Sequence, residues 1–309
     1  MSKKAFQLKV PGSTSNIGPG FDSIGIAVNL YLTLECYPSS EWEFVQKDKT
    51  FDYLPKGKDN MIYEVVLNVA KQFGIQDPPP YRVEVLSDIP IARGLGSSGA
   101  ITVSGIEIAN EILELNLSLE EKIKLAAKLE GHPDNITPSF LGGCVVSYFD
   151  GEELFYVQKQ DMGKLELVAM IPNFELRTKT AREVLPKELP FFKSIEGSAI
   201  GNVCTAAIFQ ENYALLGELM EKECFHQPYR KKLIPNFDEH VEFMKKEGAY
   251  GSFLSGAGPT ILSIFEKGKG ERSLYKWNEA YPDAEFKVLQ IPSYGAEIKE
   301  LVPIGEKNK

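Results

Sequence analysis

The 309-residue sequence is poor in cysteine and has neither a long apolar run nor an excess of basic residues. Its four cysteines, Cys36, Cys144, Cys204 and Cys224, are widely separated and include no CxxC pair, so neither a disulfide framework nor a zinc site is expected. No run of about 18 apolar residues is present, so we expect no membrane-spanning helix. The N-terminal residues also lack the apolar stretch of a signal peptide. We therefore expect a cytoplasmic protein with no membrane partner.

The charge balance is acidic, with 34 basic and 43 acidic residues and a net charge of −9. A nucleic-acid-binding surface needs a basic face, so no nucleic-acid partner is expected. An acidic protein can still bind anions at a locally positive site. The length allows one large domain or two ordinary ones. We place a boundary in the polar segment 158–164, which predicts domains at residues 1–160 and 161–309.

A glycine- and serine-rich segment, from Pro90 to Ala100, is expected to join a strand at 81–86 to a helix at 101–115. Gly94 and Gly96 allow turns that a Cβ atom would forbid, and the serines that follow are predicted to cap the helix. The start of a helix offers free N–H groups and a partial positive charge, which together favour phosphate. The lysine of the common phosphate loop is absent. An ordinary glycine turn with an N-cap is the alternative.

This segment has the pattern PxxxGLGSSxA, which resembles the nucleotide loop of the GHMP kinases. The resemblance implies an ATP-binding loop that consists of Pro90, Ile91, Ala92, Arg93, Gly94, Leu95, Gly96, Ser97, Ser98, Gly99 and Ala100. It also implies that Asn60, in the loop before a helix predicted at 61–73, approaches the adenine. A helix N-cap is the alternative role for Asn60.

A second segment, from Pro11 to Asp22, follows a strand predicted at 6–10 and is expected to be a structured loop. Asn16 and Asp22 are its strongest side-chain hydrogen-bonding groups, and turns in which they pair with their own backbone are the alternative. The segment resembles the first GHMP motif, in the form found in the branch of the family that acts on L-homoserine. That resemblance implies that Asp22 faces the substrate ammonium group and that Asn16 helps to hold its hydroxyl end.

A third segment, EGHPDN at residues 130–135, lies between a helix predicted at 119–129 and a short one predicted at 134–140. By itself His132 would be a capping or core histidine. The string resembles the same branch of the family, which implies that Glu130 and Ser98 hold Mg²⁺ through hard oxygen ligands. It further implies that His132 contacts the substrate and that Asn135 lies near the phosphoryl acceptor.

The proton acceptor is left open by the sequence. Several GHMP kinases pair an aspartate base with a lysine near the acceptor hydroxyl, and no lysine accompanies this motif. Either Asp134 is the base or no side chain is. Phosphoryl transfer depends more on positioning and charge neutralisation than on early deprotonation, so we favour a mechanism in which Asn135 only orients the hydroxyl.

Two arginines in the second half complete the predicted substrate site. A helix that begins at Thr178 would place Thr178 and Arg182 on one face, although a solvated basic turn is the alternative. The string TKTAR and the later QPYR resemble the same branch, which implies that Thr178, Arg182 and Arg230 bind the substrate. The planar guanidinium groups suit its carboxylate.

The second half alternates strands and helices, with helices expected at 195–209, 213–221, 237–247 and 270–281 and a last strand at 286–290. This order is consistent with a ferredoxin-like layer. The string SGAGPT at 255–260 resembles the third GHMP motif, which packs beside the phosphate loop. The resemblance implies an α+β, two-domain GHMP kinase fold with a ribosomal protein S5 domain 2-like N-terminal domain and a ferredoxin-like C-terminal domain.

The resemblance spans essentially the whole chain and implies a kinase reaction. It implies an ATP- and Mg²⁺-dependent enzyme that phosphorylates the hydroxyl of L-homoserine to O-phospho-L-homoserine in threonine biosynthesis, with Ser98, Glu130, Asn135 and Arg182 in catalysis. The sequence does not determine the oligomeric state, for which we expect a homodimer. One alternative is a GHMP kinase of a sugar or isoprenoid precursor, which would not need the charged groups Asp22, Arg182 and Arg230. The other is a non-catalytic ligand sensor, against which Ser98 and Glu130 argue.

Overall fold

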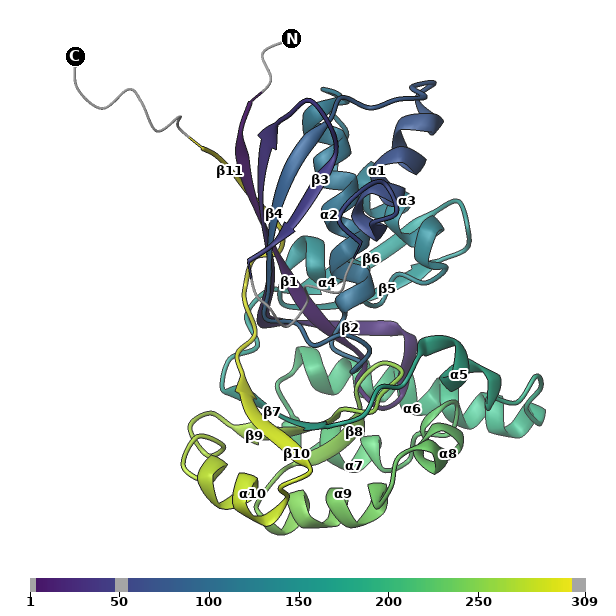
Figure 1. Ribbon diagram of the computed structural model, residues 1–309. Helices are drawn as coiled ribbons and strands as arrows, with labels where there is room; N and C mark the ends of the chain where they lie inside the picture. The colour runs from purple at the N-terminus through teal and green to yellow at the C-terminus, as the bar shows by residue number, and fades with distance from the viewer. Residues whose placement is uncertain (1–3, 48–54, 302–309) are drawn as a thin grey trace.

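The computed structural model describes residues 4–47 and 55–301. Figure 1 shows two sheets, one above the other. The two ends of the described chain lie at the end of the upper sheet that points away from the lower one. The upper sheet has the strand order β11-β1-β2-β4-β3, with β5 added to β2 and β6 added to β5. Its strands are β1 (Phe6–Asn16), β2 (Gly20–Pro38), β3 (Glu43–Gln46), β4 (Tyr81–Ser87), β5 (Cys144–Phe149), β6 (Leu154–Lys159) and β11 (Glu297–Glu300).

Among the described residues, the helices that pack with this sheet are α1 (Met61–Gln72), α2 (Ser97–Ile112), α3 (Leu119–Glu130) and α4 (Ile136–Leu141). Helix α2 is apolar on most sides and is almost wholly buried, because α1, α3 and β1 all pack against it. Helix α3 is amphipathic and begins with a capping box between Ser118 and Glu121. The N-terminus of α2 and the C-terminus of α3 therefore lie together at the edge of the sheet that faces the lower half.

The lower sheet has the strand order β10-β7-β9-β8, and every neighbouring pair is antiparallel. Its strands are β7 (Leu165–Pro172), β8 (Gly251–Leu254), β9 (Ile261–Glu266) and β10 (Ala284–Leu289). If these strands are numbered by their order in the chain, their spatial order is 4-1-3-2, and helices follow the first and third strands. This confirms the ferredoxin-like prediction. Strand β7 is buried at every residue because it lies inside the sheet.

The helices of the lower half are α5 (Thr178–Glu183), α6 (Phe191–Phe209), α7 (Tyr213–Met220), α8 (Gln227–Arg230), the 3₁₀ helix η2 (Lys231–Leu233), α9 (Phe237–Lys246) and α10 (Leu274–Ala280). Helices α7 and α9 pack on β8, and α10 packs on β10. Helix α6 packs on α7 and touches β2 of the upper sheet. No helix of the described residues is both long and apolar enough to cross a bilayer.

Some elements differ from the sequence prediction. The predicted loop from Pro11 to Asp22 is the tip of the β1–β2 hairpin, in which Asn16 and Ile17 take left-handed backbone angles that let the chain reverse tightly. Strand β11 was not predicted, because its sequence EIKE is polar and its pairing with β1 is made across the whole chain. Helix α6 begins four residues earlier than expected, directly after Pro190.

Candidate active site

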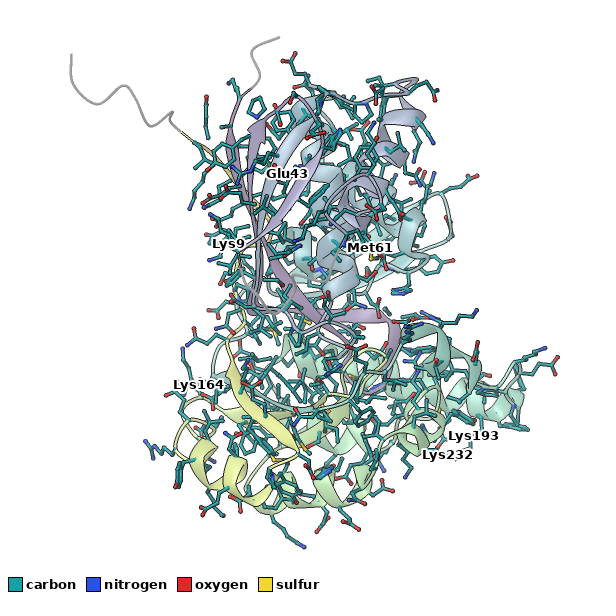
Figure 2. The ribbon with its side chains drawn as sticks, viewed as in Figure 1. Lys9, Glu43, Met61, Lys164, Lys193 and Lys232 are labelled. Carbon is teal, nitrogen blue, oxygen red and sulfur yellow. The ribbon has the colours of Figure 1, made fainter. Side chains whose placement is uncertain are left out.

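A cavity of about 800 Å³ lies where the upper and lower halves meet. Its lining comes from the β1–β2 hairpin, the segment before α2, the α3–α4 junction, α5, α8 and the β8–β9 turn. Met61, which lines it at the start of α1, is labelled in Figure 2. Segments far apart in the sequence therefore supply one site, with two chemically different ends.

The first end is the segment that leads into α2. Gly94 and Gly96 both have positive φ angles, at 78° and 77°. A Cβ atom at Gly94 would lie 2.3 Å from the Ser255 carbonyl oxygen, and one at Gly96 would lie 2.4 Å from Ser13 Oγ. Only glycine fits these positions, because both the backbone angle and the space exclude a side chain.

The predicted capping role of Ser97 and Ser98 is wrong. The N-cap of α2 is Gly96, and no side chain accepts a hydrogen bond there. The first N–H groups of α2 are therefore not satisfied by a side-chain cap, and they face the cavity with the positive end of the helix dipole. This arrangement suits an anion such as phosphate.

The β8–β9 turn holds this segment in place. Ser255 Oγ donates to the Gly94 carbonyl oxygen at 2.6 Å and lies 2.8 Å from Thr14 Oγ1. The Thr260 N–H donates to the Arg93 carbonyl oxygen. The prediction that the SGAGPT turn packs beside the phosphate loop is confirmed.

Glu130, at the end of α3, faces the first turns of α2. Its carboxylate accepts hydrogen bonds from Ser98 Oγ at 3.1 and 3.2 Å and from Thr102 Oγ1 at 2.5 Å. The carboxylate of Glu130 and the two hydroxyl groups offer only oxygen atoms as ligands, and they lie beside the N-terminus of α2, which suits phosphate. Such a set fits Mg²⁺, which prefers hard oxygen ligands and keeps waters and phosphates in its remaining positions.

The second end of the cavity is dominated by paired charges. Arg182 on α5 binds the Asp22 carboxylate through two parallel hydrogen bonds, Nη2 to Oδ1 at 2.9 Å and Nη1 to Oδ2 at 3.1 Å. Both side chains are about one third exposed. The residues are 160 positions apart, and β2 and α5 bring them together. A zwitterionic ligand would separate this ion pair, because its carboxylate would bind Arg182 and its ammonium group would bind Asp22.

Arg230, on α8, lies behind this pair. It is 2% exposed, donates from Nε to the Ala181 carbonyl oxygen at 3.1 Å and from Nη1 to the Gly256 carbonyl oxygen at 3.0 Å. Burial and the nearby Arg182 lower the Arg230 pKa to about 10, so it stays charged at neutral pH. The Phe21 ring lies 5.1 Å from its guanidinium carbon.

His132 and Asp134 form a hydrogen-bonded pair, with 2.6 Å between Nδ1 and Oδ1. Burial alone would lower the His132 pKa, but the hydrogen bond and the charge of Asp134 outweigh it and raise this pKa. Burial alone would raise the Asp134 pKa, but the hydrogen bond and the charge of His132 outweigh burial and lower it. Ligand atoms of Asp22, His132 and Asp134 all lie within 4.8 Å of one another, so this corner of the cavity brings together two carboxylates, of which Asp22 is paired with Arg182 and Asp134 with His132.

Asn135 is held by the β1 strand, because Ser13 Oγ donates to its backbone and side-chain oxygens at 2.9 and 3.1 Å. It does not cap α4 with its side chain. Asn16 lies nearby and donates from Nδ2 to the Gly256 carbonyl oxygen while it accepts from the Asp22 N–H.

Most of the residues singled out from the sequence line this one cavity. They are Asn16, Asp22, Ile91, Ala92, Arg93, Gly94, Gly96, Ser97, Ser98, Gly99, Glu130, His132, Asp134, Asn135, Thr178, Arg182 and Arg230. Pro90, Leu95 and Ala100 are not in its lining, and the last two are buried. Leu95 and Ala100 pack in the hydrophobic core instead.

Asn60 has the capping role that was its alternative. Its side chain accepts from the Ile62 N–H and donates to the Pro55 carbonyl oxygen. It also lines a smaller, mostly apolar cavity of about 140 Å³, which shares Met61, Ile91, Ser97 and Ile101 with the large one. Adenine contact by Asn60 stays a prediction.

Three supporting residues were missed by the sequence analysis. Thr102 follows Ser98 by four positions on α2, so helical spacing could have indicated it. Ser13 holds Asn135 from 122 positions away, and nothing in the sequence indicates that contact. Glu223 accepts the N–H groups of Phe225, His226 and Gln227, which fixes the start of α8 and so the position of Arg230.

Family comparisons agree with this geometry. The model described as "GHMP kinases N terminal domain" matches residues 60–143, and "GHMP kinases C terminal" matches residues 204–283. The homoserine kinase of Bacillus velezensis is 44% identical over 294 residues, which cover 95% of this chain and 94% of that protein. The homoserine kinase of Halalkalibacterium halodurans is 43% identical, with 97% and 99% covered.

Solved structures give the same result. A Listeria monocytogenes protein assigned as a homoserine kinase is 37% identical, with a TM-score of 0.82 and coverage of 95% of this chain and 99% of that one. The homoserine kinase of Cytophaga hutchinsonii has the same TM-score at 23% identity, over 97% of this chain and 98% of that one, which supports the fold alone.

Proposed function

This chain belongs to the GHMP kinase family, and from that membership we propose that it transfers the γ-phosphoryl group of ATP to the hydroxyl of L-homoserine. The products are O-phospho-L-homoserine and ADP, and the reaction serves threonine biosynthesis. Relatives that carry the homoserine kinase name match almost the full chain at 40–44% identity, and this supports the substrate. The observation that carries the proposal is a single cavity with a helix N-terminus without a side-chain cap at one end and the paired side chains of Asp22 and Arg182 at the other.

At the nucleotide end, the backbone does most of the binding. The N–H groups at the start of α2 receive phosphate oxygens, and Gly94 and Gly96 let the chain approach them closely. Ser98 and Glu130 would hold Mg²⁺, and Thr102 fixes the Glu130 carboxylate. Bound Mg²⁺ supplies positive charge that stabilises the transferring phosphoryl group.

At the amino-acid end, substrate binding exchanges partners in an ion pair. The substrate carboxylate takes Arg182, with Arg230 behind it, and the substrate ammonium takes Asp22. Thr178 lies one helical turn before Arg182 on the cavity side of α5. One partly exposed ion pair thus becomes two charge-assisted contacts, which selects an amino acid over a neutral alcohol.

The acceptor hydroxyl is oriented by Asn135, which Ser13 holds, with Asn16 on the neighbouring hairpin. Asp134 is committed to His132 and to the Asn135 N–H, and its pKa is lowered, so it is a weak base. This supports a mechanism in which positioning and charge neutralisation do the catalytic work and no side chain removes the proton early.

The cellular setting is part of the proposal. All four cysteines are free, and three of them are buried, which agrees with a reducing compartment that supplies ATP, the cytoplasm. We place the domain boundary at residues 160 and 161, between β6 and β7. We further propose a homodimer, because α6 carries an exposed apolar face.

The proposed function is tested by ADP release over a panel of acceptors. We expect turnover with L-homoserine and Mg²⁺ and none with galactose or mevalonate. Omission of either the amine or the carboxylate, as in 4-hydroxybutyrate and 3-aminopropanol, separates the two halves of the zwitterion site. Turnover of an uncharged sugar at a rate equal to that of L-homoserine would refute the proposal.

A further inference from the structure

Phe21, near the start of β2, contacts charged side chains from two helices of the lower half. Its ring centroid lies 5.1 Å from the guanidinium carbon of Arg230 and 5.9 Å from that of Arg182. Both distances are within the range of about 6 Å over which an aromatic ring attracts a cation. Figure 1 shows the start of β2 beside α5. One neutral ring is therefore shared by the two cations that bind the substrate carboxylate in the proposed reaction.

The segment that leads into α8 holds this ring. The ring of His226, the residue before α8, stacks on Phe21 with centroids 5.0 Å apart and planes 20° apart. Burial and the charge of Arg230 lower the His226 pKa to about 3, so the imidazole is neutral at neutral pH. It donates from Nε2 to the Gly18 carbonyl oxygen at 3.1 Å, in the same hairpin as Phe21. The Arg230 N–H donates to the His226 carbonyl oxygen, so the two side chains that contact the ring are one helical turn apart.

The backbone at Asp22 lets two neighbouring residues contact the same arginine. In a regular strand, successive side chains point to opposite faces. Asp22 instead has a φ of 53°, in the left-handed region that aspartate tolerates. Its carboxylate accepts two hydrogen bonds from Arg182, and the Phe21 ring lies within cation–π distance of the same guanidinium group. A charge and a ring that are adjacent in the chain therefore bind one arginine.

The two arginines repel each other, and Asp22 is the carboxylate that pairs with them. The charge of Arg182 helps to lower the Arg230 pKa, and the side-chain hydrogen bonds of Arg230 go to two backbone carbonyl oxygens. Asp22 pairs with Arg182 at 2.9 Å. In the proposed reaction the substrate ammonium group takes Asp22. Of the contacts that Arg182 makes with described residues, the one with Phe21 then remains.

A ring suits this position better than a further carboxylate would. A carboxylate beside the arginines would accept their N–H groups, which are the groups that the substrate carboxylate needs. An aromatic face attracts a cation through its quadrupole and has no lone pairs that compete for those N–H groups. The ring therefore attracts both guanidinium groups and leaves their donors to a ligand.

We propose that Phe21 is a positioning residue for the substrate carboxylate, whose ring holds the guanidinium groups of Arg182 and Arg230 once Asp22 has bound the substrate ammonium group. The inference rests on the proposed function, because it takes the ligand to be an amino acid with a free carboxylate. In the ligand-free protein Asp22 also fixes Arg182, so the ring contributes most after that ion pair has separated. A weaker ring should therefore reduce substrate affinity and leave the chemical step unchanged.

The experiment changes the charge distribution of the ring and keeps its shape. Phe21 is replaced by phenylalanines that carry one, two or three ring fluorines, because fluorine withdraws electrons and weakens the negative face. We expect the KM for L-homoserine to rise stepwise, by about tenfold over the series, while kcat and the KM for ATP stay constant. The matched control is the same series at Phe44, a buried ring of β3 over which no cation lies among the described residues. It should change none of the three constants.

Two ordinary substitutions and one ligand extend the test. Phe21→Tyr keeps an aromatic face and should keep the KM for L-homoserine near that of the wild type. Phe21→Leu stays apolar but removes the ring, so this KM should rise at least as far as with three fluorines. 3-Aminopropanol has no carboxylate and should bind all variants equally, because the ring acts through the arginines. If Phe21→Leu does not fold, the fluorinated series still decides, since it preserves the shape of the ring.

A second measurement needs no substrate. Attraction between the ring and Arg230 stabilises the ligand-free fold, so the denaturant midpoint should fall stepwise in the Phe21 series relative to the Phe44 series. A lower midpoint with a constant KM for L-homoserine would make Phe21 a structural contact only and overturn the proposal. An unchanged midpoint together with an unchanged KM would show that the ring does not attract the arginines, which also overturns it.

Failure of the proposed function gives a different result. The wild type would then not turn over L-homoserine, whereas failure of the present inference leaves wild-type turnover intact. In that case the fluorinated series is measured with the acceptor that the wild type does phosphorylate. An acceptor without a carboxylate would refute the role of Phe21 as well.

Discussion

The two ends of the cavity recognise charge by different means. The nucleotide end uses backbone N–H groups, two glycines and hydroxyl groups from one short stretch of the chain, with the Glu130 carboxylate added from the end of α3. The amino-acid end uses charged side chains from β2, α5 and α8, which already pair with each other or with backbone carbonyls. The nucleotide end can receive an anion without breaking a contact, whereas at the amino-acid end a ligand must first separate Arg182 from Asp22. Substitutions at the second end should therefore change substrate affinity, and those at the first should change the rate.

The largest effect is expected for Arg182→Ala. We expect the KM for L-homoserine to rise by a factor that corresponds to about 2–5 kcal/mol, because a desolvated carboxylate loses its partner. The KM for ATP should stay constant. Thr180→Ala, on the same helix but outside the cavity lining, is the control. The measurement is steady-state kinetics with each substrate varied in turn. An unchanged KM for L-homoserine would show that Arg182 does not bind this substrate.

The counterpart at the nucleotide end is Glu130→Gln. We expect kcat to fall about 100-fold and the Mg²⁺ concentration needed for half-maximal rate to rise, because a charged oxygen ligand becomes neutral. The KM for L-homoserine should change little. Glu120→Gln, in the first turn of the same α3 helix, is the matched control. A normal Mg²⁺ titration in the Glu130 variant would contradict the metal assignment.

Thr102→Val should have a smaller effect of the same kind. The change keeps the shape of the side chain but removes the hydroxyl that donates to Glu130 Oε1. We expect a roughly tenfold higher Mg²⁺ requirement, as is usual when a group that orients a metal ligand is lost. Ser104→Ala removes another hydroxyl of α2, one that has no hydrogen-bond partner among the described residues, and should leave the titration unchanged.

The smallest effect on kcat is expected for Asp134→Asn, milder than that of Glu130→Gln if no side-chain base operates. The change should also lower the raised His132 pKa, because it removes the hydrogen-bonded charge. NMR titration can follow His132, since the His226 pKa is lowered to about 3 and the His240 pKa is also lowered. A larger loss of kcat than in the Glu130 variant, with the fold intact, would make Asp134 the base.

The same pair predicts a pH dependence of stability. A raised His132 pKa stabilises the fold fully below the unfolded histidine pKa of about 6.5, and this contribution is lost as pH rises through the folded value. The lowered Asp134 pKa contributes stability above about pH 3.9 that is lost as pH falls through its folded value. The free energy of unfolding of the wild type, measured with denaturant, should therefore fall as pH rises from about 6.5 through the raised His132 pKa, and Asp134→Asn should flatten that slope.

The loop and helix start of the nucleotide end could be predicted from the sequence, because they are formed by residues close together in the chain. Gly94, Gly96 and Ser98 lie within five residues, and the periodic apolar residues after them identify α2. The capping prediction failed because Gly96 itself ends the loop in a left-handed conformation, which leaves Ser98 free to bind Glu130. Thr102 was within reach of the same helical reasoning.

The amino-acid end could be predicted only as separate candidates. Asp22, Arg182 and Arg230 were identified one by one through a resemblance, and no pattern in the chain indicates that Asp22 and Arg182 bind each other. Strand β11 was missed for the same reason: its pairing with β1 joins the two ends of the chain, and its own residues are polar.

The sequence alone determined most of the helices and strands, and the glycine-rich segment that leads into α2, because these depend on residues within a few positions of one another. Only the tertiary structure decided which charges meet, what holds Asn135, and that α6 keeps an apolar side uncovered. Those features depend on distances between residues more than a hundred positions apart, and such distances exist only once the two sheets are packed together.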